Sequence, residues 1–245
     1  MQLKNRFSGG GELEISGERW KLRIPAGSGA QYRLSQLDDY KDLRRSEYAW
    51  RPPFKLTLRA RVSSASLAGT WGFGLWNDPF GLSLGAGTSV LRLPALPQAA
   101  WFFAASPKSY LSFRDDLPAS GFFAQALRSS PLNSTLISAA LAFPFAPKTT
   151  RRTISRLVQE DAIRIDSDPR AWRRYTVEWA PNHTAFSVDE ALILASPISP
   201  HPPLGLVAWI DNQYAAFDPS GKLRWGVEAS PEDGWLEIDE LQVVA

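Results

Sequence analysis

The chain lacks cysteine altogether, has only two histidines, and has no apolar run long enough to cross a membrane. Without cysteine there can be no disulfide, no thiol catalysis and no cysteine-ligated metal. A transmembrane helix needs about 20 mostly apolar residues, and no stretch of that kind is present. The first ten residues also lack the apolar segment of a signal peptide. The sequence therefore predicts a cytoplasmic protein without a transmembrane segment.

The chain also lacks a large excess of charge of either sign. The 27 lysines and arginines nearly balance the 25 aspartates and glutamates, and the net charge is +2. A nucleic-acid-binding domain usually carries a basic excess, so we expect no nucleic-acid partner. Clusters of metal ligands are missing too, and we expect no metal and no cofactor. Asp166 and Asp168 resemble calcium ligands but are more typical of a loop beside Pro169.

What the chain does have is alternation of apolar and polar residues. The clearest run is 54–62, where every second residue is apolar. Similar runs occur at 20–24, 174–179, 205–210 and 236–244, and a turn at 180–183 suggests a hairpin. Period-two alternation is typical of strands with one buried face. We therefore predict an all-β, two-sheet antiparallel sandwich of the jelly-roll type, forming a single domain over residues 1–245.

Residues 118–165 interrupt this rhythm. The stretches 122–127 and 134–143 suit helix better than strand, and within 150–161 the apolar residues fall at helical spacing. We predict a helical insertion over about 118–165, laid on an edge or a face of the sandwich. Leu136 to Phe145, beside Arg151, Arg152 and Arg156, could serve as a lid, an interface or a membrane contact.

Four segments resemble the concanavalin A-like lectin/glucanase superfamily, and within it the laminarinase-like glycoside hydrolase family 16. Residues 172–189 are similar to that family's strand–turn–strand, 206–212 to a strand of its cleft, and 235–243 to its closing strand. Residues 71–76, Trp-Gly-Phe-Gly-Leu-Trp, resemble the strand before its catalytic strand. The resemblance covers about half the chain and implies a jelly-roll sandwich with a glycan ligand.

The family's catalytic strand carries a Glu-x-Asp-x-(x)-Glu motif, and this chain departs from it. The corresponding residues, 97–105, contain no carboxylate. The nearest substitute, Glu237 and Asp239, matches the closing strand better and suits a structural or surface pair. No catalytic residue of the family can be carried over, so we predict that the chain does not cleave β-glucans by the retaining mechanism.

The best candidate site combines aromatic rings with amides and acids. In 205–212 one parity gives apolar core residues and the other gives Trp209 and Asp211, which would face a concave outer surface. Tryptophan faces stack on sugar rings, while amides and carboxylates bind hydroxyls. We predict a ligand-binding site bordering one concave cavity, formed by Trp76, Asn77, Asp78, Trp101, Phe103, Trp209, Asp211, Asn212 and Tyr214.

Three functions remain open from the sequence. The first is a glycan- or small-ligand-binding protein with a degenerate glucanase-like active site. The second is an enzyme of another class, acting on a hydrophobic or glycosidic substrate in a cleft refitted with Trp101, Phe102 and Phe103. The third is an interaction protein that uses the predicted insertion. An open cleft would favour the binding protein. A closed apolar pocket with a perturbed acid would favour the enzyme, and a filled cleft would favour the interaction protein.

Overall fold

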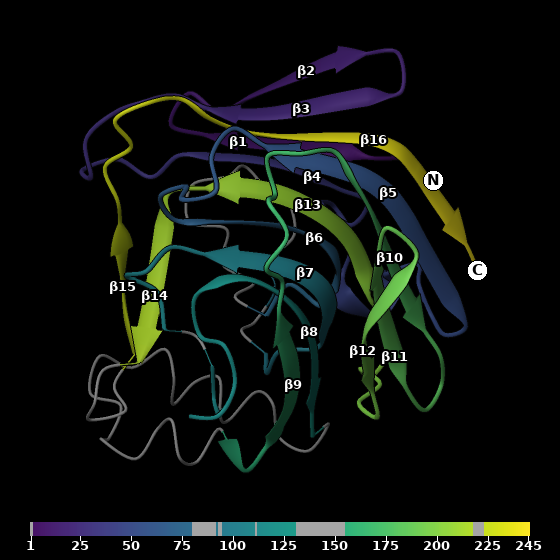
Figure 1. The fold of residues 1–245 in the computed structure, drawn as a ribbon. Coiled ribbons are helices and arrows are strands. Elements are labelled where there is room, and N and C mark those ends of the chain that lie inside the picture. Colours follow the sequence, from purple (N-terminus) through teal and green to yellow (C-terminus); the bar gives the residue numbers. More distant parts are fainter. Residues whose placement is uncertain (1, 80–91, 93–94, 111, 131–154, 218–222) are drawn as a thin grey trace.

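The computed structural model describes residues 2–79, 92, 95–110, 112–130, 155–217 and 223–245. Two large antiparallel sheets pack face to face (Figure 1). The first, sheet A, has seven strands in the order β1 (Lys4–Ser8), β4 (Leu34–Asp38), β13 (Gly205–Asp211), β6 (Thr70–Trp76), β7 (Ala99–Ala105), β8 (Gly121–Ser129) and β9 (Val158–Arg164). This arrangement confirms the predicted all-β sandwich.

Sheet B also has seven strands, in the order β12 (Ala191–Ser196), β11 (Thr184–Val188), β10 (Arg173–Trp179), β5 (Phe54–Val62), β16 (Gly234–Val244), β3 (Arg19–Ile24) and β2 (Glu12–Ser16). A separate two-stranded sheet joins β14 (Gln213–Phe217) to β15 (Leu223–Val227). A 3-10 turn, η1, covers Arg45–Glu47. In the part of the chain that is described, no helix is long and apolar enough to cross a membrane.

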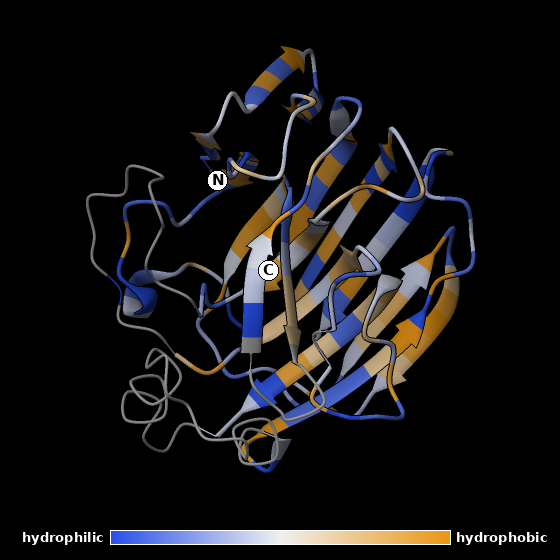
Figure 2. Cartoon of the chain, turned by 90° about the vertical axis from the view of Figure 1, so that its left-hand side faces the viewer, coloured by the Kyte–Doolittle hydropathy of each residue, from blue (hydrophilic) through white to orange (hydrophobic). Residues whose placement is uncertain are grey.

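The core lies between the two sheets and is built by alternation. On β5, every second residue from Phe54 to Val62 is buried, and the residues between them are partly or fully exposed. The banding along the strands is visible in Figure 2. On β13, Leu206, Ala208 and Ile210 join the same core. The residues of opposite parity on sheet A form a second buried cluster on its outer face.

The predicted hairpin at 180–183 is confirmed. The turn after Trp179 leads into β11, with Trp179 opposite Thr184 and the Ala180 N–H bonded to the His183 carbonyl at 3.0 Å. Asp189 and Glu190 form the next turn with positive φ values of 48° and 69°. The closing strand has a bulge between Asp239 and Gln242, where the register against β5 shifts.

The helix prediction is wrong over 121–129 and 158–164. Residues 121–129 form β8 and 158–164 form β9, so both segments belong to sheet A. The reason is that β8 is buried on both faces: Phe122, Ala124 and Ala126 face the core, while Phe123 and Leu127 face outward. A strand buried on both sides loses its alternation and reads like a buried helix. The stretch 134–143 lies outside the described residues.

Candidate functional site

An aromatic layer occupies the outer face of sheet A. Trp209 of β13, Trp76 of β6 and Trp101 of β7 meet there, with ring centroids 5.4–6.0 Å apart. Phe103, two residues along β7, lies 5.1 Å from Trp101 and 5.7 Å from Trp209. Neighbouring strands in register bring these rings together, because outward residues of adjacent strands stand side by side. The structure thus unites four of the predicted site residues.

Two glycines make room for the layer. Gly72 of β6 is paired with Trp209, and a Cβ on Gly72 would lie 2.7 Å from the Trp209 ring. Gly74 has a φ of +146°, and a Cβ there would lie 2.6 Å from the Trp101 Cα. In the structure, the indole ring of Trp209 and the backbone of β7 occupy that space.

The layer is closely packed and its indole N–H groups are already bonded. Trp209 Nε1 donates to Thr70 Oγ1 at 3.0 Å, Trp101 Nε1 donates to Gln125 Oε1 at 2.8 Å, and Trp76 Nε1 donates to the Tyr40 hydroxyl. Trp101 and Trp209 expose 8% and 7% of their surface. Trp76 is only half-buried. Trp76 is therefore the tryptophan of the layer with the most ring surface for a ligand.

Asp211 lies at the end of β13 and is strongly desolvated. Its Oδ1 accepts hydrogen bonds from the Thr70 hydroxyl at 2.8 Å and from the backbone N–H groups of Thr70 and Gln213. Its Oδ2 accepts one from the Tyr32 hydroxyl at 3.2 Å. Burial disfavours the charged form and raises the pKa of Asp211 to about 6 despite these donors. A carboxylate has about four acceptor positions, so a ligand would reach Asp211 mainly by replacing Tyr32.

The amide side chains predicted for the site form hydrogen bonds with backbone groups of the chain. Asn212 is fully buried; its Oδ1 accepts from the Arg33 N–H, and its Nδ2 donates to the carbonyls of Gln31 and Glu228. Asn77 is bonded in the same way to the backbone of Leu96 and Gln98. Both amide donors of Asn212 are used, so it has none to offer a sugar hydroxyl.

The predicted polar residues fall beside opposite ends of β6. Asp211 is paired with Thr70 at one end of β6, whereas Asn77 and Asp78 follow Trp76 at the other end, roughly 20 Å away at about 3.3 Å per residue. Asp78 forms an ion pair with Arg92 at 2.8 Å. Tyr214 lies in the two-stranded sheet, its ring over Gly226. The aromatic layer thus lies between two polar ends rather than inside one ring of polar groups.

Sequence reasoning missed a buried acid on the same face. Glu160 of β9 is 2% exposed and accepts hydrogen bonds from Gln125 Nε2 at 2.6 Å, Ser112 Oγ at 3.1 Å and the Phe113 N–H at 2.8 Å. Burial raises its pKa. Because Gln125 also accepts from Trp101, this acid connects to the aromatic layer. Reading 121–129 and 158–164 as strands would have placed both residues outward.

A second polar cluster, also missed, lies at the other side of the layer on β1 and β4. Asp38 is fully buried and pairs with Arg6 at 2.7 Å, and Gln36 Nε2 donates to it at 2.8 Å. Alternation on β4 would have placed Gln36 and Asp38 on the outer face, but the sequence shows no clear apolar alternation there to set the parity. The pKa of Asp38 is raised by burial, although Arg6 opposes the shift.

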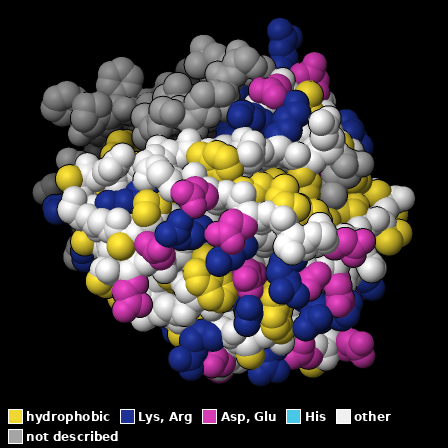
Figure 3. Space-filling view, turned by 90° about the horizontal axis from the view of Figure 1, so that it is seen from above, with side chains coloured by type: hydrophobic (Ala, Val, Ile, Leu, Met, Phe, Trp, Pro, Cys, Tyr) yellow, Lys and Arg dark blue, Asp and Glu magenta, His cyan; other side chains and the backbone are white. Residues whose placement is uncertain are grey.

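The remaining acids of interest lie elsewhere. Glu237 pairs with Arg61 at 2.6 Å and Asp239 with Arg19 at 3.3 Å, both on the outer face of sheet B. Charges of both signs are interspersed over the upper side of the molecule in Figure 3, which fits a solvated structural surface. Asp168 is bonded to Arg170 in its own loop. Across the described residues, no group of three or more histidines, aspartates and glutamates could hold a metal ion.

Comparison with known proteins shows which fold the chain adopts but finds no close relative. No protein-family model and no curated protein matches the sequence. Among solved structures, LamAcat from Zobellia galactanivorans is similar at 14% identity and a TM-score of 0.50, covering 95% of this chain and 80% of its own. A legume lectin-like domain from Entamoeba histolytica is similar at 11% identity and a TM-score of 0.49, covering 99% and 89%. The fold is the concanavalin A-like sandwich that the sequence resemblance implied.

Proposed function

We propose that this protein binds a carbohydrate across the outer face of sheet A and does not cleave β-glucans by the retaining mechanism. The observation that carries the proposal is the layer of Trp76, Trp101, Phe103 and Trp209, drawn from three adjacent strands. Aromatic faces stack on the apolar faces of sugar rings, and Trp76 has surface left for such a contact. Asp211 and Tyr32 stand at one end of the layer as hydroxyl-binding groups.

The absence of carboxylates from β7 argues against retaining hydrolysis. That mechanism needs two carboxyl groups about 5–5.5 Å apart. Strand β7, where the family motif would lie, has none. Asp211 on β13 and Glu160 on β9 are four strand spacings apart, roughly 19 Å at about 4.8 Å each. Asp38 and Asp211 are adjacent across strands but four residues offset, roughly 13 Å along the sheet.

A second function is favoured by the acid at the end of the layer. Asp211 has a pKa of about 6 and touches the half-buried Tyr32 hydroxyl, so near neutral pH it could exchange a proton with a bound group. This observation supports an enzyme of another class, acting on a hydrophobic or glycosidic substrate beside the aromatic layer. In that case Asp211→Asn would abolish turnover, while Trp76→Ala would mainly raise the KM.

Calorimetric titration with laminari-, cello- and mixed-linkage oligosaccharides tests the first function. We expect binding that Trp76→Ala weakens at least tenfold. Trp235→Ala is the matched control, because Trp235 is also half-buried but lies on the outer face of sheet B beside Lys21 and Arg61. Equal losses in both variants, or no binding of any glycan in the set, would contradict the proposal. Release of reducing ends from laminarin or lichenan would contradict the absence of hydrolysis.

A further inference from the structure

A cavity of about 370 Å³ opens at one side of the sandwich, at a distance along the sheets from the aromatic layer. It lies where β1, the edge strand of sheet A, faces β2, the edge strand of sheet B. Its apolar wall is made by Leu3, Leu13, Ile15, Trp20 and Leu37. The proposed carbohydrate face has no part in this cavity, so the two sites can be tested separately.

The cavity exists because the two sheets do not cover each other at this side. On β2, Glu12 and Glu14 form ion pairs on the outer face, so Ile15 belongs to the inner face, opposite Trp20 of β3. Inner-face residues are normally buried by the facing sheet. Ile15 is nevertheless 64% exposed, and Phe7, on the inner side of β1, is 38% exposed. The sandwich thus leaves apolar inner surface open to solvent.

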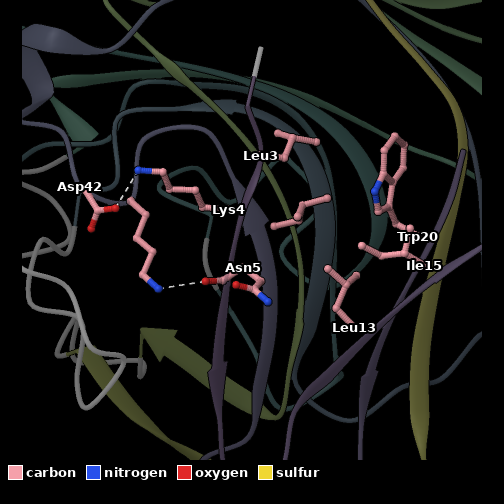
Figure 4. A pocket seen from close by; sticks show the side chains of 9 residues that line it. Leu3, Lys4, Asn5, Leu13, Ile15, Trp20 and Asp42 are labelled. Atoms are coloured by element: carbon pink, nitrogen blue, oxygen red, sulfur yellow. Dashed lines mark hydrogen bonds and ion pairs between the residues drawn. The ribbon is translucent and has the colours of Figure 1, made fainter.

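The other end of the cavity is polar and carries positive charge. Lys4 pairs with Asp42 at 2.8 Å, and Lys41 donates to the Asn5 carbonyl at 3.0 Å. Figure 4 shows Lys4, Asn5 and Asp42 on one side and Leu13, Ile15 and Trp20 on the other. Two ammonium groups and one carboxylate line the cavity, which leaves one positive charge in excess. A lysine ammonium has three donors, so Lys41 can bind an anion while keeping its backbone contact.

The apolar side continues toward the core. A second, much smaller void shares Leu3 and Leu37 with the first cavity and reaches Phe73 and Leu206 between the sheets. Leu3 stands between the two spaces, in the segment before β1 and outside any strand. A flexible apolar chain that moved the Leu3 side chain would therefore enter an entirely apolar environment.

We propose that this cavity binds a single-chain anionic amphiphile, namely an aliphatic carboxylate of medium length. The carboxylate would lie beside Lys41, and the alkyl chain would cover Ile15 and Trp20. Charge complementarity selects an anionic head, and the separation of polar and apolar ends selects an amphiphile over a compact solute. The volume is near the lower end of the range for small-molecule sites, about 300–1,000 Å³, so the site fits one chain rather than two.

Calorimetric titration with decanoate, below its micellar concentration, tests the proposal on the full chain. We expect saturable binding at least tenfold tighter than that of decyltrimethylammonium, which has the same chain and the opposite charge. Lys41→Gln should weaken decanoate binding severalfold and leave dimethyldecylamine oxide, whose head has no net charge, unaffected. Equal binding of all three amphiphiles would overturn the assignment of an anionic head.

The position of the site is tested with a matched pair of surface variants. Ile15→Asp places a negative charge in the cavity at a residue that is already 64% exposed, and it should weaken decanoate binding at least tenfold. Leu192→Asp is the control, because Leu192 is 62% exposed on β12, the opposite edge of sheet B. Equal effects would overturn the site. Sedimentation that shows a wild-type dimer dissociated by Ile15→Asp would identify a second copy as the occupant and overturn the proposal.

Discussion

Trp76 and Trp209 stack with their ring planes 6° apart and their centroids 6.0 Å apart. They come from neighbouring strands, and each stands opposite a glycine: Trp209 is paired with Gly72, and Trp76 with Gly205. Because Gly72 has no side chain, the indole of Trp209 can lie over β6, where a Cβ would come within 2.7 Å of the ring; at Gly205 the corresponding space is filled by the Tyr40 ring. The pair of Trp209 and Gly72 therefore permits the stacking, which determines the tryptophan surface that remains for a ligand.

Gly72→Ala should disrupt this stack. The new methyl group would lie 2.5 Å from the Phe102 carbonyl oxygen and 2.7 Å from the Trp209 ring, so both the ring and the backbone of β7 must shift, and overpacking of this kind costs about 1–3 kcal/mol. We expect a lower free energy of unfolding in urea and a changed near-ultraviolet circular dichroism spectrum. Gly17→Ala is the control: its φ of +62° makes alanine unfavourable, but nothing lies within 4 Å. A Gly72→Ala spectrum identical to wild type would contradict the close packing.

Trp209→Ala should destabilise the protein strongly, although Trp209 lies outside the inter-sheet core. Its side chain is 7% exposed and packs on three aromatic rings, so removal should cost about 3–5 kcal/mol. If Trp209 faced solvent, as the sequence suggests, Trp209→Ala would leave the melting temperature almost unchanged. Trp225→Ala, at a tryptophan that is 61% exposed on β15, should change stability by less than about 0.5 kcal/mol. Equal losses in urea unfolding would contradict this assignment.

Much of sheet B could be predicted because one face of strands such as β5 and β10 meets solvent. On β5 and β10 the polar residues between buried positions give a clear period of two, and the hairpin after Trp179 follows from its turn residues. Strand β8 gave no such signal. Its outward residues, including Phe123 and Leu127, are as apolar as its core residues because the outer face of sheet A is also buried. The burial of the outer face of sheet A therefore accounts both for the wrong helix prediction within 118–165 and for the aromatic layer.

The candidate site was predicted in part for a similar reason. Parity along β13 correctly separates Trp209 and Asp211 from Leu206, Ala208 and Ile210. Parity cannot say how far apart two strand ends lie: Asn77 follows one end of β6, whereas Asp211 of β13 lies opposite Thr70 at the other end. Nor can it distinguish an amide that binds a ligand from one that, like Asn212, satisfies backbone groups.

Asn212→Asp should be strongly destabilising because the amide is a structural clamp. The substituted oxygen would face the carbonyls of Gln31 and Glu228, which now accept hydrogen bonds at 3.0 and 2.9 Å. Leaving buried polar groups without partners costs about 1–3 kcal/mol each, and we expect a loss of at least about 3 kcal/mol in urea unfolding. Asn182→Asp, in the exposed turn after β10, makes the same chemical change and should be nearly neutral. A small effect at Asn212 would favour its role as a ligand-binding group.

Asp211 should make stability depend on pH between about 4 and 6. Its pKa is about 6 in the folded chain, because burial disfavours the charge, against about 3.9 in an unfolded chain. Over this window the folded state holds a proton that the unfolded state has released, so stability is greatest below about pH 4 and falls as the pH rises toward 6. A difference of about two in pKa corresponds to about 3 kcal/mol.

Asp211→Asn isolates this contribution, because an amide of the same shape does not titrate. Other groups, including Asp39 with its pKa of about 6, remain in both proteins and cancel in the comparison. Urea unfolding at intervals from pH 4 to pH 7.5 should show that the wild-type protein loses about 3 kcal/mol relative to the variant as the pH rises through this window. Above pH 6 the difference should be constant. Parallel stability curves for the two proteins would mean that Asp211 is ionised throughout, and the proposed role of Asp211 as an acid near neutral pH would then be untenable.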